Sequence, residues 1–231
     1  MTQNKSESDF DAVIFDCDGV LVDSEAMYHE VEIEVLAALG LAYDAHDFKA
    51  RFMGMSDKAF YAALDEDALA RIGRPVAAEF HPRVKARAAE EVHRLVAVAG
   101  AGEAVDAVRG LKAVASSSTT AALEFKLKRA GLWERFVPHI YSSEHVAHAK
   151  PAPDLFLHAA KALDVAPSRC LVIEDSVNGV RAGLAAGMQV WGFMGGGHMD
   201  DRSRERLLAA NVARVVENWS DAKALLSAAR S

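Results

Sequence analysis

Acidic residues crowd the end of an apolar run near the beginning of the chain, in the stretch DCDGVLVDS at residues 16–24. The carboxylates are those of Asp16, Asp18 and Asp23, with Gly19 among them. Aspartate is disfavoured in strands, and neighbouring carboxylates repel one another. The spacing therefore indicates that a cation neutralises these side chains, or that a reaction uses them.

Three further stretches carry groups of complementary chemistry, and each lies at or just beyond the end of a short apolar run. They are SSST at 116–119, KPAPD at 150–154 and EDS at 174–176. The carboxyl ends of parallel strands meet at one edge of a sheet, so acids, hydroxyls and Lys150 are expected to converge there. Grouped carboxylates favour a hard divalent cation such as Mg²⁺, while hydroxyls and a lysine suit a phosphate. The residues alone therefore predict metal-assisted phosphoryl transfer.

The elements that must position these groups are predicted by the alternation of short apolar runs with helical patterns. Strands are expected at 11–16, 112–116, 139–143, 170–175, 189–193 and 213–217. Helices are expected at 101–109, 119–130, 154–163, 177–186, 203–210 and 220–229. Such alternation is typical of an α/β fold, in which helices cover both faces of a parallel sheet.

The stretch at 24–95 has no good strand candidate. Its helical period begins with SEAMYHEVEIEVLAALG and continues in alanine-rich segments, with a break expected near Pro82. We interpret it as an all-helical domain inserted after the first strand. The expected organisation is a discontinuous core domain of residues 1–23 and 97–231, with a helical domain of residues 24–96.

Composition narrows the class of protein. The chain has 231 residues and is 51% hydrophobic, enough for a sizeable core. Its net charge of −7 argues against a nucleic-acid surface and mildly against an anionic membrane surface. The polar start does not resemble a signal peptide, and no run of apolar residues is long enough to span a membrane. Cys17 and Cys170 form no metal-ligand pattern, so a cytoplasmic protein with reduced thiols is expected.

The motifs DCDGVLVDS, SSST, KPAPD and EDS, in this order and spacing, resemble the four motifs of the haloacid dehalogenase superfamily. The helical insertion resembles the α-helical cap of the phosphoglycolate phosphatase and β-phosphoglucomutase type. The resemblance extends from about residue 11 to residue 218. It implies a Rossmann-like core, dependence on Mg²⁺ and a covalent aspartyl-phosphate intermediate.

The resemblance also implies roles for individual residues. Asp16 corresponds to the nucleophile, and Asp18 to the general acid–base that protonates the leaving alcohol and then activates water. Ser116 corresponds to the hydroxyl that binds the transferring phosphoryl group, and Ser117 is expected to contact the substrate. Lys150 would balance charge between nucleophile and phosphate.

The implied metal ligands are Asp16, the backbone carbonyl of Asp18, Asp175, and Glu174 directly or through water. Arg51, in the stretch RFMGMS, is expected to contact the substrate, because the family often has a basic residue on a cap loop there.

Asp18 also narrows the reaction, because dehalogenases and phosphonatases of this superfamily lack an acid two residues after the nucleophile. We expect a phosphatase for a sugar phosphate or sugar-acid phosphate, acting as a monomer or weak homodimer. A β-phosphoglucomutase-like phosphotransferase and a catalytically idle binding protein remain alternatives. The mutases used for comparison carry a histidine twelve residues after the nucleophile. Here that position is Tyr28 and the histidine is His29, which favours the hydrolase.

Several other features have plainer interpretations. Asp23 is expected to hold the hinge loop rather than to act in the reaction. GGGH at 195–198 is interpreted as a flexible loop, with a substrate or cap contact as the alternative. His145 and His148 are expected to be surface or loop histidines. A solvated helix face is expected for Lys126, Lys128 and Arg129.

Overall fold

The computed structural model describes residues 10–52, 55 and 57–228. The chain divides into two compact units. One contains the residues up to Asp23 together with those from Val96 onward, and the other is Ser24–Leu95. Each unit is described below by itself.

The first unit is built on a six-stranded sheet of order β3-β2-β1-β4-β5-β6, in which all neighbouring strands are parallel. The strands are β1 Ala12–Phe15, β2 Leu111–Ser116, β3 Ile140–Ser142, β4 Cys170–Glu174, β5 Gln189–Phe193 and β6 Arg214–Val216. In register, Phe15 of β1 lies opposite Val114 and Ile173. Asp16, Ser116 and Glu174 therefore leave the sheet at the same edge. The predicted α/β fold with a parallel sheet is confirmed.

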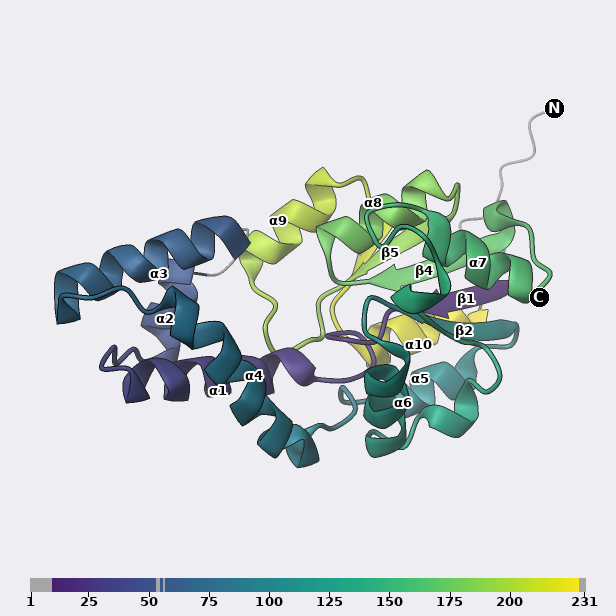
Figure 1. Ribbon diagram of the computed structural model, residues 1–231. Helices are drawn as coiled ribbons and strands as arrows, with labels where there is room; N and C mark the ends of the chain where they lie inside the picture. Colours follow the sequence, from purple (N-terminus) through teal and green to yellow (C-terminus); the bar gives the residue numbers. More distant parts are fainter. Residues whose placement is uncertain (1–9, 53–54, 56, 229–231) are drawn as a thin grey trace. The chain divides into compact units, whose positions relative to one another are not determined.

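Helices cover both faces of this sheet (Figure 1). On one side lie α7 Asp154–Ala162, α8 Val177–Ala185 and α9 Asp201–Ala209. On the other side lie α5 Ala101–Ala107, α6 Thr120–Arg129 and α10 Trp219–Ala228. Short 3₁₀ turns complete the connections at Trp133–Arg135, Ser143–His145 and Pro167–Arg169.

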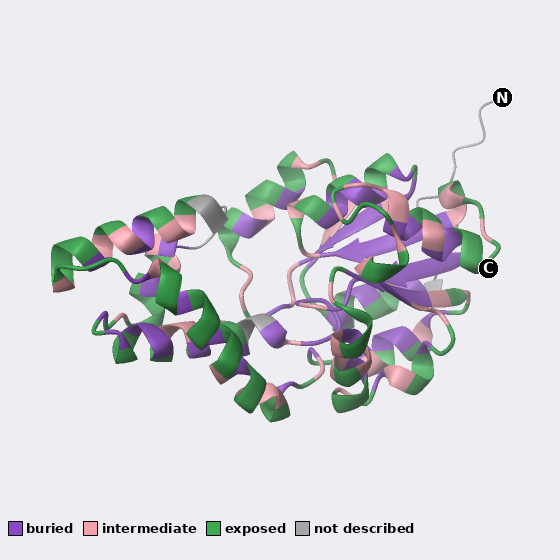
Figure 2. Cartoon of the chain, viewed as in Figure 1, coloured by how far each residue is buried: buried purple, intermediate pink, exposed green. Residues whose placement is uncertain are grey.

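Strand β1 is buried along its whole length because it lies between two apolar layers (Figure 2). Ala12 and Ile14 belong to the core cluster that includes α7 and α8. Phe15 packs on the other side, with its ring centroid 5.6 Å from that of Phe136 and 5.8 Å from that of Trp219. Removing a fully buried aromatic ring of this kind costs roughly 3–5 kcal/mol of folding free energy. The strand that carries the acidic motif is thus anchored on both faces.

The second unit contains α1 Ser24–Ala38, α2 Ala45–Phe52, α3 Asp57–Ile72, α4 Ala77–Glu91 and the 3₁₀ turn η1 Val92–Arg94. Its centre is a chain of aromatic contacts, in which the ring of Phe52 lies 5.2 Å from Phe48 and 5.1 Å from Phe60. The expected break near Pro82 is wrong, because α4 continues through it. Phe80, Val84 and Ala88 bury one face of α4, and this packing offsets the one hydrogen bond that proline cannot donate.

In the part of the chain that the structure describes, no helix combines the length and the apolar character needed to cross a membrane.

The two cysteines generate a testable prediction. Cys17 and Cys170 are both free thiols buried in the first unit. Burial raises the pKa of both thiols, to about 11 for Cys170. We expect neither to react with a thiol reagent such as dithionitrobenzoate in the native protein at pH 8, and both to react in guanidinium chloride. Native labelling of either cysteine at the rate seen in denaturant would contradict this packing.

Candidate active site

Lys150 is the centre of the site at the carboxyl edge of the sheet. Its ammonium group donates to Asp16 Oδ1 at 2.6 Å, to Glu174 Oε1 at 2.7 Å and to the carbonyl oxygen of Ala115 at 2.9 Å. The side chain of Lys150 is only 4% exposed. A lysine has three ammonium protons, so these three acceptors use all of its donors. Lys150 therefore ties the ends of β1, β2 and β4 together.

Burial sets the electrostatics of this centre. Burial raises the pKa of the Asp16 carboxyl; Lys150 opposes that shift, and the neighbouring carboxylates of Glu174, Asp175 and Asp18 add to it. For Lys150, burial alone would lower the pKa, but Asp16 and Glu174 outweigh burial and raise it. The ammonium group is thus held in its charged form. This single positive charge does not neutralise all of the carboxylates around it.

Three carboxylates form a group that could hold a cation. One oxygen each from Asp16, Glu174 and Asp175 lies within 4.8 Å of the others. Two ligands of a single Mg²⁺ ion lie at most about 4.2 Å apart, because each Mg–O distance is about 2.1 Å. A small inward movement of the side chains would therefore satisfy the ion. The hard oxygen donors and the shortage of positive charge both fit Mg²⁺.

Glu174 is held by several hydrogen bonds. Its Oε2 atom accepts from both the backbone N–H and the hydroxyl of Ser176, at 2.9 Å each, while Oε1 accepts from Lys150. The side chain packs against helix α8, where Gly179 leaves the room it needs. A Cβ atom at Gly179 would lie 1.7 Å from Oε1. Local structure thus fixes this carboxylate in one place.

The loop after Asp16 is held by a tight turn and by the C-terminal helix. Gly19 has φ +75°, a conformation that favours glycine, and its N–H donates to the carbonyl of Val22. Its lack of a side chain is also required, because a Cβ there would lie 1.9 Å from Asp175 Oδ2. The indole N–H of Trp219 donates to the carbonyl of Val20 at 2.9 Å. Asp18 lies in this loop, next to the carboxylates of Asp16, Glu174 and Asp175.

Asp18 has partners that the sequence analysis missed. Its Oδ1 atom accepts from Lys126 Nζ at 2.5 Å, and its Oδ2 atom accepts from the Ser118 hydroxyl at 2.9 Å. Lys126 Nζ also donates to Ser118 Oγ at 3.0 Å. The expectation that Lys126 belongs to a solvated helix face is wrong, because its side chain is only 14% exposed. Lys128, 54% exposed and paired with Glu124, does lie on such a face.

The serines of the second motif occupy different positions. Ser116 is buried at the end of β2, where its hydroxyl oxygen accepts from the backbone N–H of Ser118. Ser117 is exposed, and its carbonyl accepts from the hydroxyl of Ser143. The structure thus places Ser116 at the carboxyl edge that also carries Asp16, and Ser117 one residue beyond it.

The GGGH loop has a defined contact. His198 Nε2 lies 3.3 Å from Asp175 Oδ2, and both side chains are nearly buried. A Cβ atom at Gly19 would lie 2.7 Å from His198 Cε1, so the imidazole also covers the turn of the first motif. The expected flexible loop therefore brings a histidine against one of the predicted metal ligands. Glycine-rich loops show no periodicity, so no pattern in the sequence indicated this contact.

Arg51 lies in the second unit, where its guanidinium group has partners of its own. It donates to both carboxylate oxygens of Asp67, at 3.1 and 2.9 Å, and to Glu66 at 3.3 Å. Asp67 also accepts from the hydroxyl of Tyr43 at 2.8 Å. The hydrogen bond from Arg51 holds the pKa of Asp67 below its usual range. A contact of Arg51 with substrate stays a prediction.

Asp23 and the histidines behave as structural residues. The backbone N–H of Asp23 donates to the carbonyl of Val96, so the chain segments that leave and re-enter the first unit lie side by side. His145 Nδ1 accepts from the backbone N–H of Ser142, and His148 Nδ1 lies 2.9 Å from Asp154 Oδ2. The structure gives each of these histidines a local partner.

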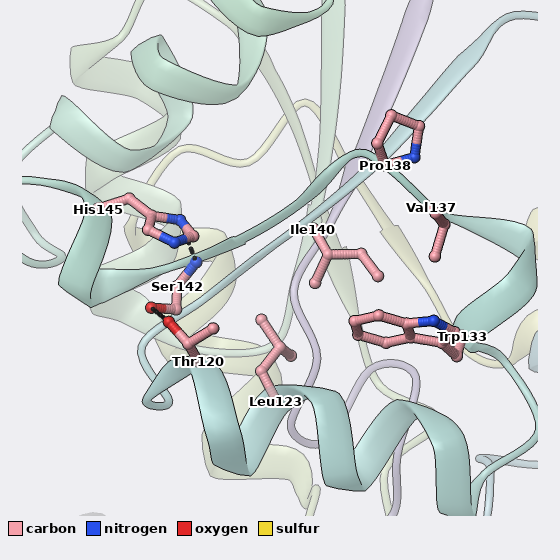
Figure 3. A pocket seen from close by; sticks show the side chains of 8 residues that line it. All are labelled: Thr120, Leu123, Trp133, Val137, Pro138, Ile140, Ser142 and His145. Atoms are coloured by element: carbon pink, nitrogen blue, oxygen red, sulfur yellow. Dashed lines mark hydrogen bonds between the residues drawn. The ribbon is translucent and has the colours of Figure 1, made fainter.

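A separate cavity of about 120 Å³ lies beside the edge strand β3 (Figure 3). Its lining is Thr120, Leu123, Trp133, Val137, Pro138, Ile140, Ser142 and His145. The lining is mainly apolar, and its polar groups bond to each other, as with the 2.9 Å contact between the hydroxyls of Thr120 and Ser142. The cavity therefore offers no charged group for phosphate chemistry.

The fold and the site together define an α/β protein with a lysine-bridged acidic centre at the carboxyl edge of its parallel sheet. The family model for haloacid dehalogenase-like hydrolases matches residues 10–187. The chain therefore belongs to the haloacid dehalogenase-like hydrolase family, and the predicted family and enzyme class are confirmed.

Several relatives of this chain are named phosphatases. The chain is 29% identical to the 6-phosphogluconate phosphatase of Escherichia coli over 83% of this chain and 86% of that protein. It is 33% identical to the fructose-1-phosphate phosphatase YqaB of the same organism, over 76% and 92% of the two chains. Among solved structures, a family hydrolase from Deinococcus radiodurans with bound phosphate and sodium is 36% identical. Its TM-score is 0.83, and the match covers 96% of this chain and 97% of that one.

The packing of Gly179 against Glu174 can be tested by substitution. Gly179→Ala places a methyl group on the carboxylate and should cost roughly 1–3 kcal/mol of folding free energy, as overpacking does. Gly102→Ala is the matched control. It lies in helix α5, and its new Cβ meets only the Arg135 side chain at 3.4 Å. Thermal unfolding followed by circular dichroism should rank Gly179→Ala below wild type and Gly102→Ala at or above it. Equal melting temperatures for the two variants would contradict the site geometry.

Proposed function

We propose that this protein is a Mg²⁺-dependent phosphatase. It hydrolyses a small phosphorylated metabolite, a sugar phosphate or sugar-acid phosphate, through a covalent phosphate on Asp16. The observation that carries the proposal is the placement of Lys150 between Asp16 and Glu174, beside Asp175. A buried carboxylate next to a fixed positive charge can approach a phosphate dianion that would otherwise repel it.

The proposed reaction has two balanced steps. In the first, a carboxylate oxygen of Asp16 attacks phosphorus, the bond from phosphorus to the substrate oxygen breaks, and Asp18 gives its proton to the departing alkoxide. In the second, water attacks the phosphorus of the aspartyl phosphate and passes a proton to Asp18. Inorganic phosphate leaves, and both aspartates return to their starting states. In both steps the Ser116 hydroxyl would donate to a phosphoryl oxygen, and the positive charge of Lys150 beside Asp16 would offset the charge of the phosphoryl group.

The residues that would hold Mg²⁺ are Asp16, Asp175 and the backbone carbonyl of Asp18. Glu174 would act directly through Oε1 or through water, since its Oε2 atom already accepts two hydrogen bonds. When bound, the ion would supply positive charge that offsets the repulsion between phosphate and carboxylates. With Asp18 ionised, the four carboxylates and the ammonium groups of Lys150 and Lys126 leave a formal charge of −2, which one divalent ion cancels.

The substrate class is inferred from the relatives, whose names include 6-phosphogluconate phosphatase, fructose-1-phosphate phosphatase and hexitol phosphatase. All three substrates are phosphate monoesters of small polyols, sugars or sugar acids. The second unit is proposed to act as the cap that selects among them.

The first test is a panel of phosphorylated sugars, hexitols and sugar acids, assayed for phosphate release with Mg²⁺ and with excess chelator. We expect hydrolysis of at least one member and of p-nitrophenyl phosphate, with both activities lost in chelator and restored by added Mg²⁺. Full turnover in chelator would contradict the metal dependence.

The same assay separates hydrolysis from phosphotransfer. A mutase converts β-glucose 1-phosphate, primed with a trace of the 1,6-bisphosphate, to glucose 6-phosphate faster than it releases phosphate. The likeness to a structure titled a putative β-phosphoglucomutase from Thermotoga maritima, with 28% identity and a TM-score of 0.73, keeps this alternative in view. Tyr28 at the position of the mutase histidine favours hydrolysis, so free phosphate is the expected main product.

The second test addresses covalent catalysis. Asp16→Asn keeps the shape of the side chain but removes the nucleophile, so kcat should fall at least about 10³-fold while the fold is retained. Asp18→Asn should also be inactive, and phosphate trapped on Asp16 should be visible by mass spectrometry. Asp164→Asn, at an exposed turn, is the control and should match wild type. Retention of a tenth of the wild-type rate by Asp16→Asn would rule out this residue as nucleophile.

A further inference from the structure

Lys126 is held against the proposed general acid–base, at a position outside the four motifs of the sequence analysis. Its ammonium group contacts Asp18 Oδ1 and Ser118 Oγ, and the Ser118 hydroxyl donates to Asp18 Oδ2. These contacts close a ring of lysine, serine and carboxylate in which both Asp18 oxygens have a partner. We propose that Lys126, with Ser118, is a positioning residue that fixes the Asp18 carboxylate for proton transfer. This inference rests on the proposed phosphatase function.

The sequence places Lys126 inward through the phase of helix α6. The helix begins directly after the second motif, where the Thr119 hydroxyl oxygen accepts from the backbone N–H of Ala122. Leu123 and Leu127 are buried at i and i+4, and Lys126 lies three residues after Leu123 on the same side. The helix thus delivers the ammonium group to the end of β1.

The burial of Lys126 has an energetic consequence. A lysine with only 14% of its side chain exposed has lost most of its hydration, and it is stable there only with a carboxylate partner. Asp18, whose side chain is 26% exposed, is that partner. The pair therefore stabilises one rotamer of each side chain rather than merely adding charge at the surface.

Lys150 cannot take over this task. Its three ammonium protons are used by Asp16, Glu174 and the carbonyl of Ala115. Without Lys126, the Asp18 carboxylate would face Asp16 and an incoming phosphate, all of them negative, and its Oδ1 atom would lose the positive charge that holds it. Repulsion would then favour rotamers that turn Asp18 away from the leaving oxygen. A misplacement of about 1 Å is enough to slow a reaction on the order of 10²-fold.

The role predicts a dependence on the leaving group. An alkoxide needs a proton from Asp18 as it departs, whereas p-nitrophenolate is stable without one. The leaving group departs in the first step, which kcat/KM reports, so loss of Lys126 should lower kcat/KM for alkyl phosphates much more than for p-nitrophenyl phosphate. A purely structural role would lower both rates together.

The test uses Lys126→Met, which keeps the length of the side chain and removes the charge. With the best alkyl phosphate of the panel, kcat/KM should fall about 100-fold, and with p-nitrophenyl phosphate less than about fivefold. Lys126→Arg keeps the charge and should recover most of the alkyl phosphate rate. Lys128→Met, on the same helix but exposed, should match wild type for both substrates.

Several outcomes would overturn the inference. Equal losses for the two substrates, or no loss beyond that of Lys128→Met, would do so. A raised KM with unchanged kcat for both substrates would instead make Lys126 a substrate-binding residue. If Lys126→Met does not fold, Ser118→Ala removes the other partner of Asp18. This variant should show the same preference for p-nitrophenyl phosphate over alkyl phosphates, with a smaller loss of rate. Absence of that preference in Ser118→Ala would count against the proposal. A wild-type protein inactive on the whole panel would overturn the proposed function itself.

Discussion

Carboxylates gathered at one edge of a sheet repel one another, and the structure depends on how that repulsion is relieved. Lys150 relieves it by bonding to Asp16 and Glu174 at once, from a position that solvent hardly reaches. Its third donor binds the backbone of β2, so the same ammonium group also fixes the spacing of three strand ends. Removing one partner from such a buried arrangement typically costs about 3–5 kcal/mol, because an uncompensated charge remains. The same three hydrogen bonds of Lys150 therefore set both the charge balance and the geometry of this edge of the sheet.

The rest of the first unit holds this edge in register. Parallel pairing of β1 with β2 and β4 sets the acids at one level, and the rings of Phe136 and Trp219 fix β1 from one side. Trp219 contributes twice, since its indole N–H also binds the loop that carries Asp18. A residue from the last helix thus controls the first motif across nearly the whole length of the sequence. The position of the first motif therefore depends on packing between segments that are distant in the sequence.

Much of this could be predicted because the chemistry lies at the ends of strongly apolar strands. The runs before Asp16 and Glu174 are buried throughout, so their hydrophobic pattern located both the strands and the acids that end them. Pro82 was misjudged because helix packing outweighed the missing hydrogen bond. Lys126 did leave a signal, since Leu123 and Leu127 define the buried side of its helix and it follows their phase. His198 left none, because its place depends on how a glycine-rich loop folds over Gly19.

The two aspartates of the first motif receive different surroundings, and this difference supports different tasks. Asp16 is nearly buried and held by a lysine that solvent hardly reaches, which suits its proposed role as nucleophile. Asp18 is a quarter exposed and held by a second lysine and a hydroxyl. An acid that gives a proton to a leaving oxygen and takes one from water must be reachable by both. Proteins give two neighbouring carboxylates different roles by placing them in different environments of this kind. One lysine for each aspartate makes that division possible within three residues of chain.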